Sequence, residues 1–108
     1  MATYIKKGVW GFNQLHPVLS KCFGWIERHY EKRGKDCKIT SVAEGNHTTG
    51  SLHYIFRAID FANLEEVFGT IRTIINNFCN KYGIPKHHFD LVYYEDLKIF
   101  HLEYDVVK

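Results

Sequence analysis

Two segments of the chain carry apolar side chains at three- and four-residue steps, which is the pattern of a helix with one buried stripe. The first segment covers 13–33, and its stripe consists of Leu15, Val18, Leu19, Cys22, Ile26 and Tyr30. The second covers 64–82, and its stripe consists of Leu64, Val67, Phe68, Ile71, Ile75, Phe78 and Cys79. Because each stripe must be covered by another apolar surface, the rest of the chain has to supply that surface.

The ends of both predicted helices carry the expected boundary residues. Asn13 is placed to cap the first helix, and Gly34 to end it. Asn63 and Glu66 stand three residues apart as a capping box for the second helix, which Gly83 ends.

The segments between and after these helices have the composition of strands. Residues 37–43 are rich in β-branched side chains, 51–61 favour an extended chain, and 89–95 with 98–107 are close enough to form a hairpin. The order helix, strand, strand, helix, strand, strand predicts an α+β domain. We expect an antiparallel sheet with the two main helices on one face, which leaves the other face free to carry chemistry.

The last predicted strand alternates between apolar and polar side chains. One face, expected beneath the helices, consists of Phe100, Leu102, Tyr104 and Val106; the opposite face consists of Ile99, His101, Glu103 and Asp105. If Asp96 opposes Phe100 across a three-residue loop, Glu95 lies directly opposite His101. This juxtaposition fits a metal site with a general base, but it also fits a cross-strand polar pair on a solvated face.

Composition excludes several classes of protein. A chain of 108 residues with 45% hydrophobic side chains predicts one globular domain, 1–108. A net charge of +2 gives no electrostatic case for nucleic acid, and no apolar run is long enough for a membrane span. The three cysteines form no C-x-x-C pair, which argues against a disulfide scaffold or a structural zinc site. They lie within the apolar patterns of the predicted helices and first strand, so we expect them to be small buried apolar residues. The first ten residues, MATYIKKGVW, lack the features of a signal peptide.

Seven histidines are many for so short a chain, and two of them, His53 and His101, lie within or shortly after segments that resemble a known family. Residues 51–60, SLHYIFRAID, resemble the S-x-H-x-x-G-x-A-x-D motif of zinc D-alanyl-D-alanine-type peptidases. The related amino-terminal signalling domain of hedgehog proteins has SLHYEGRAVD here. Residues 90–95, DLVYYE, are similar to hedgehog's DWVYYE, and His101 follows at the family's spacing. The resemblance extends over about 13–107, with Phe56 at the family's glycine position.

The resemblance implies a catalytic metal site. His53, Asp60 and His101 would bind one Zn²⁺ per chain, which leaves the fourth tetrahedral position to water. Glu95 matches the glutamate that takes the proton of that water. His47 matches a hedgehog histidine that would donate to an oxyanion or contact substrate. Spacing alone does not bring His53 and Asp60 together, because a seven-residue separation suits neither a straight strand nor one helix turn.

The implied function is that of a zinc metallopeptidase, a hydrolase that cleaves D-amino-acid-containing stem peptides of bacterial peptidoglycan. Carboxypeptidase and endopeptidase activity both stay open, because residues 39–44 lack the arginine with which the peptidases grip a substrate carboxylate. We expect a monomer whose partner is the peptidoglycan peptide. A phage endolysin, held in the host cytoplasm until its release for cell wall degradation, fits this description. The alternatives are a non-catalytic zinc-binding, hedgehog-like interaction module and a metal-free structural domain.

Overall fold

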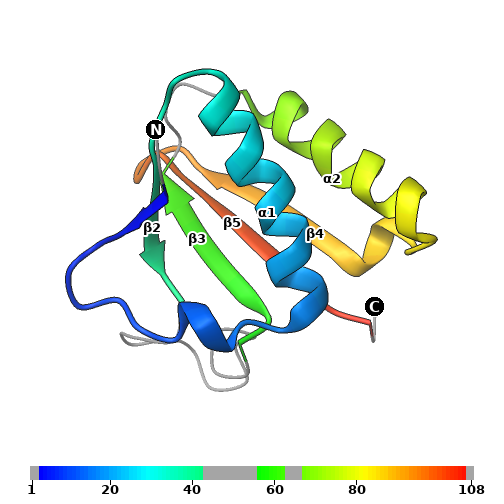
Figure 1. Ribbon diagram of the computed structural model, residues 1–108, viewed down its shortest axis with the longest axis horizontal. Coiled ribbons are helices and arrows are strands. Elements are labelled where there is room, and N and C mark those ends of the chain that lie inside the picture. Colours follow the sequence, from blue (N-terminus) through cyan, green and yellow to red (C-terminus); the bar gives the residue numbers. More distant parts are fainter. Residues whose placement is uncertain (1–2, 43–55, 63–66, 107–108) are drawn as a thin grey trace.

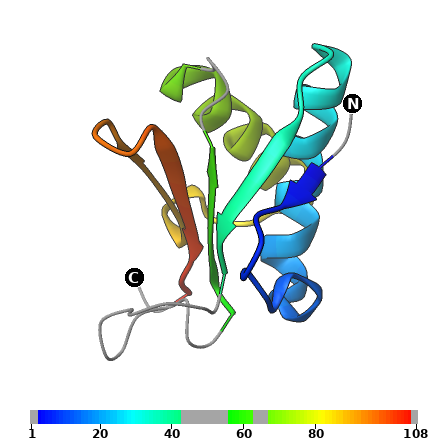
Figure 2. The same ribbon diagram turned by 90° about the vertical axis from the view of Figure 1, so that its left-hand side faces the viewer.

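The computed structural model describes residues 3–42, 56–62 and 67–106, which form two helices and one five-stranded sheet (Figure 1). The helices are α1 (Pro17–Lys32) and α2 (Phe68–Tyr82). The strands are β1 (Thr3–Ile5), β2 (Cys37–Ser41), β3 (Ala58–Ala62), β4 (Phe89–Tyr94) and β5 (Ile99–Tyr104). Short 3-10 turns, η1 (Phe12–Gln14) and η3 (Lys86–His88), precede α1 and β4. Both helices cover the same face of the sheet (Figure 2), so the predicted α+β class is confirmed.

The sheet is mixed, whereas the sequence predicted an antiparallel one. Its strand order is β1-β2-β3-β5-β4, and β1 pairs with β2 in parallel, with Thr3 opposite Cys37 and Ile5 opposite Ile39. The other three pairings are antiparallel. The prediction is wrong at this edge because β1 has three residues, too few for an alternating pattern to be recognised.

Helix α1 begins four residues later than the predicted cap. Leu15 and His16 have extended backbones, with ψ angles of 144° and 134°. A residue before proline is biased away from the helical region, which explains the start at Pro17. His16 caps the helix, because its Nδ1 accepts a hydrogen bond of 3.2 Å from the backbone N–H of Val18. The predicted end at Gly34 is confirmed by its left-handed φ of 68°.

Helix α2 begins at Phe68 and ends where the sequence predicted. Gly83 has a φ of 68°, and the N–H of Ile84 donates to the carbonyl oxygen of Cys79 at 3.0 Å. The predicted capping box of Asn63 and Glu66 lies outside the described residues.

The core between the helices and the sheet is rich in aromatic rings. The Phe61 ring of β3 lies 5.2 Å from that of Phe23 and 5.4 Å from that of Phe100, measured between centroids, and all three side chains are fully buried. Cys22, Cys37 and Cys79 are also buried, as predicted, and burial raises the pKa of each thiol. No helix within 3–42, 56–62 and 67–106 has the length and hydrophobicity to cross a membrane.

Replacing Phe61 tests this packing. We expect Phe61→Ala to lower the free energy of unfolding by about 3–5 kcal/mol, because a cavity would open among rings that cannot collapse onto it. Leu97→Ala is the matched control, since Leu97 is 68% exposed and should change stability by no more than about 0.5 kcal/mol. Urea unfolding followed by circular dichroism measures both, and equal stability of the two variants would contradict the packing described.

Candidate functional site

The open face of the sheet brings together two of the residues that the resemblance implies as zinc ligands. Asp60 on β3 lies directly opposite His101 on the neighbouring strand β5. Its Oδ1 is 2.7 Å from His101 Nδ1, and each side chain is 13% exposed. Because directly opposed residues of paired strands point to the same face, the pairing of β3 with β5 is what unites them.

Glu103 is the third member of this cluster. It lies two residues beyond His101 on the same face of β5, and its Oε1 is 2.9 Å from His101 Nε2. Both ring nitrogens of His101 therefore face a carboxylate. The sequence analysis placed His101 and Glu103 on the face away from the core, which the structure confirms.

The charge of His101 follows from this geometry. Burial alone would lower the pKa of the imidazole, but hydrogen bonds and charges from Asp60 and Glu103 outweigh burial, so the pKa of His101 is raised. An imidazole donates from both nitrogens only when it is protonated. Without a metal, the cluster thus holds an imidazolium between two carboxylates.

Apolar side chains border this cluster on the β4 side. Val92 is directly opposite His101, and the Tyr94 ring lies 6.1 Å from the His101 ring in an edge-on arrangement. Both Val92 and Tyr94 are more than 40% exposed. The cluster therefore lies beside an exposed apolar and aromatic surface.

Glu95 does not pair with His101 across the hairpin, and the register proposed from the sequence is wrong. Tyr94 pairs with Ile99 and Val92 with His101, so residues 95–98 form the turn. The N–H of Lys98 donates to the carbonyl oxygen of Glu95 at 3.3 Å, and Lys98 has a left-handed φ of 54°. Lysine rarely adopts this conformation, so the sequence did not predict a turn of this type. Glu95 instead contributes, with its neighbours in 93–97, to an open cavity of about 270 Å³.

His47 and His53 lie outside the described residues, so their roles stay predictions. Within 3–42, 56–62 and 67–106, no group of three or more His, Cys, Asp or Glu side chains is placed to hold a metal ion. The structure thus brings Asp60 and His101 together, whereas the third implied ligand, His53, lies outside the described residues.

Phe56 has an unusual backbone conformation at the start of the chain segment that leads to Asp60. Its φ is 59°, in the left-handed region that glycine adopts readily and bulky residues rarely do. The backbone is held there by the N–H of His16, which donates to the Phe56 carbonyl oxygen at 2.9 Å, and the Phe56 ring lies 6.1 Å from that of Trp10. The position where the resembling family has glycine is thus one at which glycine would be unstrained.

His16 has a structural role that the sequence analysis missed. Besides capping α1, its ring lies 5.0 Å from that of Tyr104. Burial and the charge of Arg57 lower its pKa, which keeps the imidazole neutral and Nδ1 able to accept the capping hydrogen bond. The proline that follows His16 was the available signal, because it marks the first turn of a helix.

No family model, curated protein or solved structure matches the chain.

Two substitutions at Phe56 test the backbone conformation. We expect Phe56→Gly to be more stable than Phe56→Ala by about 1 kcal/mol, because both lose the ring and only glycine relieves the left-handed strain. At Val92, in a regular strand, the order should reverse, with Ala more stable than Gly. Urea unfolding of the four variants measures both differences, and an alanine at 56 as stable as glycine would contradict a strained position.

The His101 cluster predicts a pH dependence of the metal-free protein. Because the folded pKa is raised above 6.5, its stabilisation should be complete below about pH 6.5 and be lost as pH rises through the folded pKa. Titration of the His101 ring signals by NMR in the presence of a chelator measures that pKa. We expect Glu103→Gln to lower it and Asp96→Asn, in the exposed turn, to leave it within error. A His101 pKa below 6.5 in the wild type would refute the cluster.

Proposed function

We propose that the chain is a zinc-dependent metallopeptidase that hydrolyses peptide bonds in peptidoglycan stem peptides. The observation that carries the proposal is the Asp60–His101–Glu103 cluster on the open face of the sheet. Asp60 on β3 ends the first motif of the resemblance, and His101 on β5 follows the second motif, which lies in β4 and the turn after it. The left-handed backbone of Phe56, at the family's glycine position, adds independent support.

Two donor atoms of the cluster are of the types that bind zinc. A carboxylate oxygen and an imidazole nitrogen are common zinc ligands, and Asp60 Oδ1 and His101 Nδ1 are close enough to share one cation once the proton between them leaves. Glu103 would then remain on His101 Nε2, which is the position of the outer carboxylate that orients a metal-binding histidine. His53 would complete the ligand set, by resemblance.

The division of chemical roles follows from these positions. Zinc, when bound, lowers the pKa of a coordinated water and polarises a carbonyl group. Glu95 would accept the proton of that water, and its exposed position in the turn beside Tyr94 leaves it accessible to a substrate. Tyr94 and Val92 provide an apolar surface beside the cluster for the bound peptide. A monomeric phage endolysin that acts on the cell wall is the setting that this proposal fits.

A non-catalytic zinc-binding module is the second candidate. The observation in its favour is the position of Glu95 in a turn: strand pairing does not hold this carboxylate opposite His101. The two candidates share the metal ligands and differ in hydrolysis alone, so they require separate measurements.

Zinc binding tests what both candidates share. We expect the wild type to bind one equivalent of zinc and Asp60→Ala and His101→Ala to lose it. Glu103→Gln should bind zinc about 10–100-fold more weakly, because outer partners of metal ligands have effects of that size. Asp96→Asn, which removes a carboxylate from an exposed turn position, is the control and should bind normally. Absence of zinc in the reconstituted wild type, or full binding by both alanine variants, would refute the metal site.

Release of fragments from purified peptidoglycan separates the two candidates. We expect hydrolysis by the wild type and by Glu31→Gln, an exposed position on α1, and loss of hydrolysis with retained zinc in Glu95→Gln. Stoichiometric zinc without any hydrolysis by the wild type would establish the binding module instead. Undiminished hydrolysis by Glu95→Gln would show that another group accepts the proton.

A further inference from the structure

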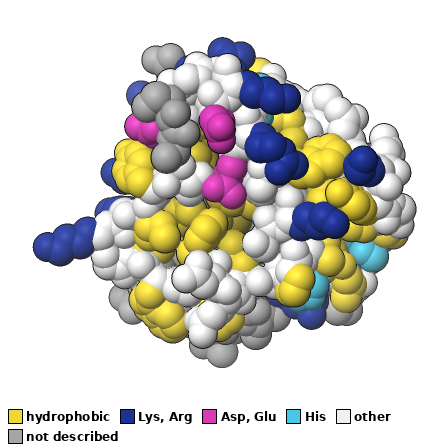
Figure 3. Space-filling model, viewed as in Figure 1, with side chains coloured by type: hydrophobic (Ala, Val, Ile, Leu, Met, Phe, Trp, Pro, Cys, Tyr) yellow, Lys and Arg dark blue, Asp and Glu magenta, His cyan; other side chains and the backbone are white. Residues whose placement is uncertain are grey.

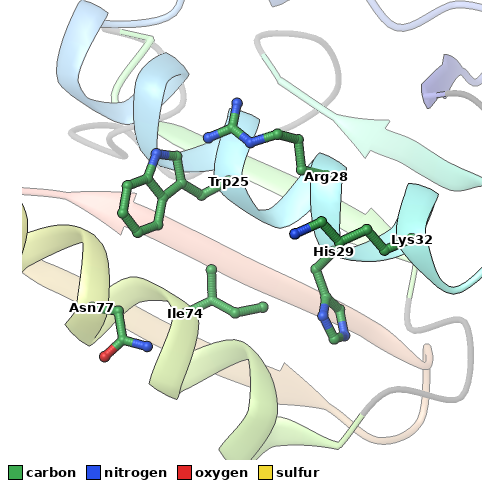
Figure 4. Close-up of a pocket in the computed structure, with 6 residues that line it drawn as sticks. All are labelled: Trp25, Arg28, His29, Lys32, Ile74 and Asn77. Atoms are coloured by element: carbon green, nitrogen blue, oxygen red, sulfur yellow. The ribbon is translucent and has the colours of Figure 1, made fainter.

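A groove between α1 and α2 lies on the face of the molecule opposite the Asp60–His101–Glu103 cluster. Its volume is about 340 Å³, and it is lined by Trp25, Arg28, His29, Lys32, Ile74 and Asn77. Figure 4 shows Trp25, Arg28, His29 and Lys32 extending from α1, with Ile74 and Asn77 facing them from α2. This volume lies at the lower end of the range for small-ligand sites.

The polar groups of the groove are suited to a negatively charged ligand. The described residues that line it include a guanidinium, an ammonium, an indole and an amide, and none of these residues is a carboxylate. Arg28 and Lys32 stand four residues apart, so both cations lie on the same side of α1. Arg28 lies 5.9 Å above the ring of Trp25, which leaves the cation next to an aromatic surface.

The acidic residues of α1 lie on another side of the helix. The Thr3 hydroxyl of β1 donates to the Glu27 carboxylate, so Glu27 faces β1 instead of α2. Glu31, one turn later, follows Glu27 on that side. Helix α2 contains no Asp or Glu. Lys and Arg side chains accordingly gather over the helices in Figure 3, although the net charge of the chain is only +2.

We propose that this groove binds a phosphate-bearing sugar or polyol chain of the bacterial cell wall. Arg28 and Lys32 would contact phosphates, while the Trp25 ring and Ile74 offer apolar surface to the C–H groups of the sugar or polyol between them. The preference for an anion rests on the lining alone, and the choice of a wall polymer rests on the proposed function. Because the groove and the cluster lie on opposite faces, the polymer would leave the cluster open to stem peptides.

Fluorescence of Trp25 measures binding directly in a Trp10→Phe background, which removes the other tryptophan. The probe is poly(glycerol phosphate), with neutral dextran as the uncharged comparison. We expect only the phosphate polymer to bind. An Arg28→Gln/Lys32→Gln variant should bind it with an affinity reduced by at least about tenfold. A Lys6→Gln/Lys7→Gln variant removes the same charge at exposed positions away from the groove, and should change affinity by no more than about twofold.

The inference would be overturned if the polymer did not bind, if dextran bound as tightly, or if the two double variants lost the same amount of affinity for the polymer. It would also be overturned if single-stranded RNA or phosphatidylglycerol vesicles bound as tightly as the polymer and lost affinity in the Arg28→Gln/Lys32→Gln variant. Zinc content and hydrolysis of a soluble stem peptide are measured on the same samples. If the groove does not bind the polymer, zinc content and hydrolysis will be unchanged. If the proposed function is wrong, zinc binding and hydrolysis will be absent and polymer binding will remain.

Discussion

The pairing of β3 with β5 is the interaction on which both the core and the candidate site depend. It sets Phe61 opposite Phe100 on the helix-covered face and Asp60 opposite His101 on the open face. Because side chains alternate along a strand, a slip of one residue would expose Phe100 and press His101 against the helices. Packing of the aromatic core therefore selects the register that brings the Asp60 and His101 side chains together.

The open-face cluster is stable as a unit because its charges satisfy one another. A half-buried carboxylate or imidazolium without a partner would be costly, and removal of one member leaves the others uncompensated. His101 lies between Asp60 and Glu103, so each of its ring nitrogens has an acceptor. A cation that replaces the proton on the Asp60 side would preserve the contact on the Glu103 side.

Much of the fold follows from patterns that a single element carries by itself. The apolar stripes predicted both helices, and the alternation of β5 predicted which of its residues are buried. Features that depend on one backbone angle were missed: the left-handed Lys98 sets the hairpin register, and the extended His16 delays α1. β1 is stabilised by its neighbour more than by its own three residues.

The candidate site was less predictable, because its members are far apart in the chain. Nothing local in residues 58–62 indicates that Asp60 meets His101, 41 residues later; the motif resemblance placed both in one site before any contact was known. The position of Glu103 beside His101 could be predicted from β5 alone, because residues two apart along a strand lie on the same face. The predicted pairing of Glu95 with His101 was wrong because it assumed a three-residue loop, whereas residues 95–98 form the turn.

The two faces of the sheet allow separate functions to be carried by one small domain. The cluster is built from β3 and β5, whereas the groove is built from α1 and α2, and the core of Phe23, Phe61 and Phe100 lies between them. Among the described residues, none belongs to both the lining of the groove and the cluster. Substitutions of groove residues should therefore leave the contacts of the cluster intact, whereas substitutions in the cluster change its own charge balance as well. On the proposed function, the domain would hold its substrate matrix on one face and keep the opposite face free for chemistry.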